Sequence, residues 1–275
     1  MFGQAERVLE LNRAAAGFSR GGDSKIFAFT SGKGGTGKTF LSLNIAHALS
    51  MQYKILYIDF DQNLSNANIM FNEIPETTIF DFFAGKSLLN ETIVEYEPNL
   101  HFIFGDSGRL SYPRVKTESI IYFFNQLEKV YPDYDFIFID TGSGANEEIF
   151  SILTKADVNI IVTTPEPTAV MDGYVMLKLL NAHSFDGKKT ILLNKCGDED
   201  EGETAFKNLT AAAGHFLNEK LNLLGIISFD KAVVETIMAQ EPILKHSPLS
   251  TACRQIKAVS DNLYEFAHMA NIQQS

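Results

Sequence analysis

The sequence predicts an α/β fold, in which a mostly parallel central β-sheet has helices on both faces. Two observations predict it. Apolar runs of strand length recur along the chain, and longer segments with helical spacing separate them. Most of the runs are apolar throughout, which is typical of parallel strands buried on both faces. The expected strands cover residues 26–30, 55–59, 100–104, 136–140, 159–163, 190–194 and 223–228.

Helical spacing is clearest in residues 40–50, 120–130 and 253–269. Residues 1–16 also have the spacing of a short helix, and the Gly- and Ser-rich segment 17–24 separates this helix from the first strand. We therefore expect two parts. The first is an N-terminal helical arm with a flexible linker at 1–24, and the second is a single α/β domain at 25–275.

Composition excludes several classes of protein. The chain has 23 Lys and Arg against 34 Asp and Glu, a net charge of -11, so a broad basic surface for nucleic acid is not expected. Two cysteines are too few for a disulfide framework. No stretch approaches the roughly 18 apolar residues of a membrane span. We expect a soluble cytoplasmic protein.

The first expected strand leads directly into a glycine-rich loop and a helix. Gly32, Gly37, Lys38 and Thr39 satisfy the P-loop pattern G-x-x-x-x-G-K-S/T. Glycines let backbone N–H groups surround phosphate oxygens, and the helix N-terminus adds its dipole. Lys38 is expected to neutralise the β- and γ-phosphates and Thr39 to ligate Mg²⁺. The expected nucleotide contacts in the loop are Gly34, Gly35, Thr36, Gly37, Lys38 and Thr39.

Carboxylates follow two other expected strands. Asp59 and Asp61 end the second strand, and Asp140 ends the strand at 136–140. Ligands of open α/β sheets bind at the carboxyl ends of the strands, so these side chains are expected beside the phosphate loop. Asp140 has the form of a Walker B aspartate that holds Mg²⁺ through water, and the N–H of Gly142 is placed to reach the γ-phosphate.

The strand at 190–194 runs into Asn194 and Lys195, which we expect near the base. Guanine-specific proteins of related fold use N-K-x-D at this point. Here Gly197 takes the place of the aspartate, and Asp198 comes one residue late. This favours adenine, and therefore ATP, with Asn194 as the base contact. GTP remains the alternative.

A second lysine at the start of the loop, Lys33, extends the pattern. Residues 33–39 resemble the deviant Walker A motif K-G-G-x-G-K-S/T of the MinD/ParA family of ATPases, and the resemblance runs from about residue 25 to 262. It implies an ATP-dependent homodimer in which Lys33 crosses to the nucleotide of the partner. It also implies slow ATP hydrolysis, with Asp61 at the attacking water and Asp59 in the surroundings of the metal.

Two further segments resemble the flagellar-number branch of that family, FlhG (also called FleN). Residues 164–172 match its T-P-E-P-T-x-x-x-D run, in which Pro165 packs near the adenine and ribose, and residues 140–144 are close to its D-T-G-A-G. Residues 3–9 partly resemble its N-terminal D-Q-A-x-x-L-R element. The branch implies control of flagellar number or placement, through an FlhF-like GTPase contacted by residues 1–16 and through flagellar basal-body or regulatory proteins.

Two other functions remain open. A MinD- or ParA-like ATPase would position the division septum, a replicon or another cargo. A metabolic or redox enzyme on the same fold, such as a nitrogenase iron protein, would need cluster-bridging cysteines, which the position of Cys196 does not favour. Residues 262–275 contain no Lys or Arg, so direct membrane binding is not expected. Partners are then expected to recruit the protein to the cell pole or the inner membrane face.

Overall fold

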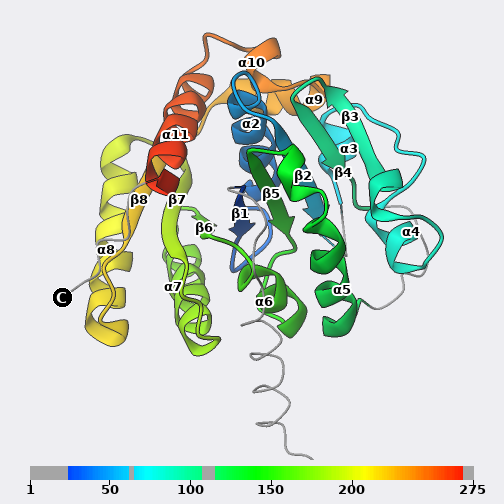
Figure 1. Cartoon of the computed structure of the whole chain (residues 1–275). Helices are drawn as coiled ribbons and strands as arrows, with labels where there is room; N and C mark the ends of the chain where they lie inside the picture. The colour runs from blue at the N-terminus through cyan, green and yellow to red at the C-terminus, as the bar shows by residue number, and fades with distance from the viewer. Residues whose placement is uncertain (1–23, 62–64, 107–114, 269–275) are drawn as a thin grey trace, which may run out of the picture.

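The computed structural model describes residues 24–61, 65–106 and 115–268, which are built around an eight-stranded sheet (Figure 1). The strand order is β3-β4-β2-β5-β1-β6-β7-β8. β3 is antiparallel to β4, and the other neighbours are parallel. The strands are β1 (Lys25–Thr30), β2 (Ile55–Phe60), β3 (Ile93–Glu97), β4 (Leu100–Ile103), β5 (Phe136–Thr141), β6 (Val158–Thr163), β7 (Lys188–Cys196) and β8 (Asn222–Ser228).

Helices cover both faces of this sheet, as the sequence predicts. The α-helices are α2 (Lys38–Leu49), α3 (Ala67–Met70), α4 (Ile79–Phe83), α5 (Thr117–Leu127), α6 (Glu147–Leu153), α7 (Pro167–Ala182), α8 (Glu199–Leu217), α9 (Lys231–Ala239), α10 (Ile243–His246) and α11 (Thr251–His268). Short 3-10 turns lie at Leu89–Thr92 and Tyr131–Asp133. In Figure 1, α2 and α11 lie above the sheet, α5 to α7 lie below it, and α8 stands along the left edge.

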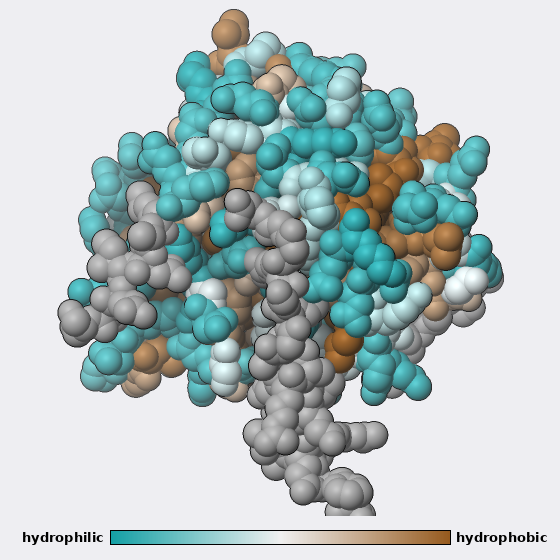
Figure 2. All heavy atoms as spheres, in the orientation of Figure 1, coloured by the Kyte–Doolittle hydropathy of each residue, from teal (hydrophilic) through white to brown (hydrophobic). Residues whose placement is uncertain are grey.

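Each face of the sheet has its own hydrophobic core. Alternate residues of a strand point to opposite faces. Phe27 and Phe29 of β1 therefore join the core under α2 and α11, whereas Ile26 and Ala28 join the core over α5 to α8. Figure 2 shows that the surface of the face seen in Figure 1 is mostly hydrophilic, with hydrophobic side chains gathered on the side of β3 and α4. None of the described helices combines the length and apolar character that a membrane crossing requires.

The predicted strands and helices are confirmed to within a few residues at their ends. The strand that the sequence analysis did not predict is β3, which forms an edge hairpin with β4 and is only half-buried. Its alternation of apolar residues with glutamates is typical of an edge strand with one face in water. The expected arm and linker at 1–24 lie outside the described residues except for Ser24, and so does the tail at 269–275.

Candidate functional site

The glycine-rich loop connects β1 to α2 at the carboxyl edge of the sheet. Gly35 and Gly37 have φ values of 79° and 84°, a left-handed conformation that favours glycine. A Cβ atom on Gly37 would lie 2.3 Å from the side-chain nitrogen of Asn194. Gly37 also caps α2, so the free N–H groups of a twelve-residue helix face the loop. This is the backbone arrangement that binds phosphate.

Two side chains at the end of β7 contact the backbone of this loop. Asn194 Nδ2 donates to the carbonyl of Thr36 at 2.7 Å, and Lys195 Nζ donates to the carbonyl of Gly35 at 2.7 Å. Lys195 itself has a φ of 58°. The two residues expected near the base are thus brought against the loop, and their contact with the base stays a prediction.

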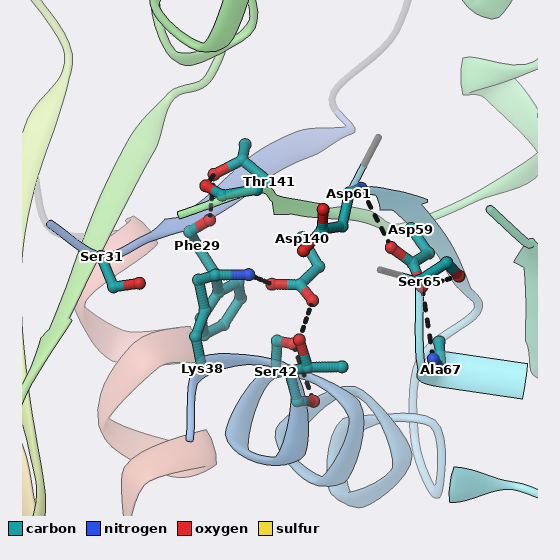
Figure 3. A network of polar contacts seen from close by, with 12 residues as sticks. Phe29, Ser31, Lys38, Ser42, Asp59, Asp61, Ser65, Ala67, Asp140 and Thr141 are labelled. Carbon is teal, nitrogen blue, oxygen red and sulfur yellow. Dashed lines mark hydrogen bonds and ion pairs between the residues drawn. The ribbon is translucent and has the colours of Figure 1, made fainter. Parts of the chain in front are cut away.

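Lys38 and Thr39 both bind Asp140 at the end of β5 (Figure 3). The ammonium of Lys38 lies 2.5 Å from Asp140 Oδ1, and the hydroxyl of Thr39 donates to Oδ2 at 2.6 Å. Lys38 is 6% exposed and Asp140 is fully buried. A buried charge is tolerated only when it is paired. In this state Lys38 neutralises the charge of Asp140, and the hydroxyl of Thr39 donates to its second oxygen. The predicted loop lysine, hydroxyl and Walker B carboxylate therefore meet.

Asp59 lies beside Asp140, because the register of β2 and β5 pairs the two positions. Its Oδ1 accepts the N–H of Asp61 at 3.1 Å, and its Oδ2 accepts the hydroxyl of Ser65 at 2.5 Å and the N–H of Ala67 at 3.3 Å (Figure 3). Burial, followed by the negative charge of Asp140, raises the pKa of Asp59 to about 6. Adjacent buried carboxylates of this kind attract a cation.

Asp61 lies over the loop that follows β5. A Cβ atom on Gly142 would lie 3.5 Å from Asp61 Oδ1, so the carboxylate is close to the backbone that the sequence assigns to the γ-phosphate. The N–H of Gly144 donates to the carbonyl of Ser31 at 3.0 Å. The loop after β5 and the glycine-rich loop are thereby joined, with Asp61 beside them.

Lys33 points toward α7 of its own chain. Its Nζ lies 3.3 Å from the hydroxyl of Thr168 in an exposed contact. The backbone of the loop also approaches α7, because a Cβ atom on Gly32 would lie only 2.5 Å from Asp172 Cβ. The exposed carboxylate of Glu166 has a lowered pKa, chiefly through a hydrogen bond from the Thr164 hydroxyl and also through nearby Lys33 and Lys195. Pro165, the predicted nucleotide contact, lies in the same turn between β6 and α7.

The donor atoms fit Mg²⁺ with a nucleotide. Among the described residues, no three His, Cys, Asp or Glu side chains form a cluster that could hold a metal ion without other ligands. Thr39, Asp59 and Asp140 offer oxygen atoms, and Mg²⁺ prefers oxygen and usually completes its shell with water and phosphate. The buried hydroxyl of Thr36 in the loop makes no hydrogen bond in the structure, which leaves it available to a phosphate oxygen.

Some polar residues of the site were not singled out by the sequence analysis. Ser65 binds Asp59, and Thr168 contacts Lys33. Tyr57 and Ser42 lie buried beneath the carboxylates. A signal was available for Tyr57, because a tyrosine two residues before a strand-end aspartate shares its face of the sheet.

Comparisons with known proteins agree with this geometry. A family model described as an AAA domain matches residues 24–186. The chain is 26% identical to the antiactivator FleN of Pseudomonas aeruginosa, over 90% of this chain and 89% of FleN. It is 30% identical to the flagellum site-determining protein YlxH of Helicobacter pylori, over 88% of this chain and 83% of YlxH. The septum site-determining protein MinD of Pyrococcus horikoshii, solved with Mg-ADP, superposes with a TM-score of 0.74 at 24% identity and covers 90% of this chain and 100% of its own.

Proposed function

The chain belongs to the AAA-domain family of MinD/ParA-type P-loop ATPases, and we propose that it acts as an ATP-driven dimer switch that controls the number or placement of flagella. Membership makes it an ATPase that uses ATP and Mg²⁺. The observation that supports the switch is the exposed position of Lys33. This lysine stands at the rim of the loop in an exposed contact with Thr168, whereas Lys38 is buried inside the site.

Within one subunit, each residue of the site has a separate role. Mg²⁺ supplies charge neutralisation and a Lewis acid. With nucleotide bound, Lys38 would exchange the carboxylate of Asp140 for the β- and γ-phosphates, and the hydroxyl of Thr39 would hold the metal. Asp140 would hold the metal through water, with Asp59 beside it. Gly142 donates its N–H to the γ-phosphate, and Asp61 orients the attacking water.

Between subunits, Lys33 provides the link. In the proposed homodimer two subunits face each other through their phosphate loops, and Lys33 of each reaches the nucleotide of the other. A cation that approaches the γ-phosphate from a partner chain stabilises the charge of the transition state. Hydrolysis removes that phosphate and lets the dimer separate. Slow turnover suits this role, since the nucleotide state is the signal.

The flagellar role is supported by the two relatives that cover most of the chain, an antiactivator and a flagellum site-determining protein. The proposed partners are an FlhF-like GTPase, bound by residues 1–16, and flagellar basal-body or regulatory proteins. Residues 1–16 lie outside the described part of the chain. These partners would recruit the protein from the cytoplasm to the cell pole or the inner membrane face.

A second candidate is a MinD- or ParA-like positioning role for the septum, a replicon or another cargo. The fold similarity to MinD favours it. The net charge of -11 does not favour a DNA-coating partition protein, which needs a basic face.

Deletion of the gene in its source organism, scored by electron microscopy of whole cells, separates the two functions. We expect an altered number or position of flagella, restored by the parent gene and not by Lys33→Ala. Complementation by Lys178→Ala, which removes an exposed lysine of α7, is the matched control. Normal flagella together with minicells or lost replicons would contradict the flagellar role and favour the second candidate.

A further inference from the structure

A buried hydroxyl pair lies beneath the carboxylates of the site. Tyr57 Oη and Ser42 Oγ are 2.8 Å apart, and both side chains are fully buried. A buried hydroxyl costs free energy unless it is hydrogen-bonded, and a phenylalanine would fill the same space without this requirement. The position of the pair next to Asp140 suggests a role for the Tyr57 hydroxyl.

The strand register places Tyr57 under Asp140. β2 and β5 pair Tyr57 with Phe138 and Asp59 with Asp140. Residues two apart share a face of the sheet, so all four side chains point toward α2. The ring of Tyr57 packs on Phe102, with centroids 5.4 Å apart. Its hydroxyl therefore lies between α2 and the diagonal neighbour Asp140.

The hydroxyl of Tyr57 stays protonated and can donate. A tyrosine hydroxyl carries its proton at neutral pH, and this one lies near the carboxylate of Asp140. In the described arrangement Ser42 uses its one proton on the carbonyl of Thr39, at 3.1 Å. Tyr57 accordingly donates to Ser42 in that arrangement.

The hydrogen bonds of Asp140 must change when nucleotide binds. Its two oxygens now accept from Lys38 and Thr39. Under the proposed function, both donors turn away to the phosphates and the metal. Asp140 is fully buried, and the proposed metal-bound water would occupy only one of its two oxygens, so the other oxygen needs a donor from the protein at that moment.

We propose that Tyr57 is a positioning residue for Asp140, and that its hydroxyl turns from Ser42 to the carboxylate when Lys38 and Thr39 leave. Ser42 supports the turn by donating to Tyr57 in place of the Thr39 carbonyl. The role rests on the proposed ATP site. It fixes the carboxylate that faces the metal and has no part in binding the phosphates.

The test is Tyr57→Phe, measured with a fluorescent ATP analogue in Mg²⁺ and in EDTA. We expect unchanged affinity in EDTA and about tenfold weaker affinity in Mg²⁺, because a hydrogen bond to a charged group is lost only in the metal-bound state. Half-saturating Mg²⁺ should rise in parallel. Ser42→Ala should shift both quantities in the same direction, and the double variant should be no weaker than Tyr57→Phe alone.

Tyr122→Phe, which removes a hydroxyl from an exposed tyrosine of α5, is the matched control and should bind as the parent does. Equal weakening in Mg²⁺ and in EDTA would mean a purely structural role and overturn the proposal, and unchanged affinity in both conditions would overturn it as well. If Tyr57→Phe does not fold, Ser42→Ala decides by the same ratio. A parent protein that binds no analogue with Mg²⁺ would instead overturn the ATP site itself.

Discussion

The ammonium of Lys33 lies 3.3 Å from the hydroxyl of Thr168, at the first turn of α7 in the same chain. The contact is exposed, and a single hydrogen bond of this kind contributes about 1 kcal/mol at most. Lys38, only five residues along, is buried against Asp140. One lysine of the loop therefore pairs with a carboxylate inside its own site, whereas the other makes an exposed contact that costs little to break, as its proposed role toward a second subunit requires.

Lys38→Ala should abolish ATP binding. It removes the cation that the phosphates require, so we expect a loss of affinity of about hundredfold or more, measured by calorimetric titration with Mg-ATP. Lys178→Ala is the control. Retention of micromolar affinity would contradict the assignment of the loop.

The same change leaves Asp140 buried without its cation, and it should lower the free energy of unfolding of the nucleotide-free protein by about 3 kcal/mol. Lys38→Gln keeps a donor toward Asp140 and should be more stable than Lys38→Ala while binding ATP no better. This separates loss of the site from loss of the fold.

Asp61→Ala should bind ATP but hydrolyse it at least about a hundredfold more slowly, because water is no longer oriented beside Gly142. An ATP-bound dimer should then accumulate. Phosphate release measures the rate, and gel filtration with ATP measures the dimer. Asp261→Ala, an exposed aspartate of α11, is the control. Normal turnover in Asp61→Ala would refute the role of Asp61.

His47 should make the fold less stable in mild acid. It is 1% exposed, and its Nε2 lies 3.5 Å from Oε1 of Glu97. Burial lowers the pKa of His47 below the ordinary 6.5, and Lys245 adds to this, against the opposing charge of Glu97. His47 therefore binds a proton less readily in the folded chain than in the unfolded chain, which takes one up below pH 6.5. The free energy of unfolding is thus fully retained above pH 6.5 and falls as the pH falls below it.

Urea unfolding at pH 7.5 and pH 5.5 measures this effect. Between these values the parent should lose about 1 kcal/mol more than His47→Leu, whose side chain cannot bind a proton. His215→Gln, at an exposed position of α8, should behave as the parent does. Equal losses in the parent and in His47→Leu would contradict the prediction.

The parts of the site that the sequence predicts are those carried by short motifs at strand ends. Lys38, Thr39 and Asp140 meet because the glycine-rich loop leads from the end of β1 to Lys38 and Thr39, while Asp140 lies at the end of β5, and parallel strands bring their carboxyl ends to one edge of the sheet. The apolar runs identify seven of the eight strands for the same reason, since strands buried on both faces have continuous hydrophobicity.

The remaining features depend on packing between elements. The edge strand β3 is half-buried and lacks a continuous apolar run. The bond between Tyr57 and Ser42 requires the spacing of β2 and α2, and the contact of Lys33 with Thr168 joins positions far apart in the chain. No local pattern encodes these distances, so they follow only from the assembled fold.

The central claim is that ATP drives dimerisation through Lys33, and the molar mass in solution tests it most directly. Light scattering with Mg²⁺ should give the monomer mass of 30.6 kDa without nucleotide and with ADP, and twice that mass with ATP. Lys33→Ala should remain a monomer with ATP while binding it with nearly unchanged affinity. A parent mass that does not respond to ATP, or a Lys33→Ala dimer that persists, would contradict the account.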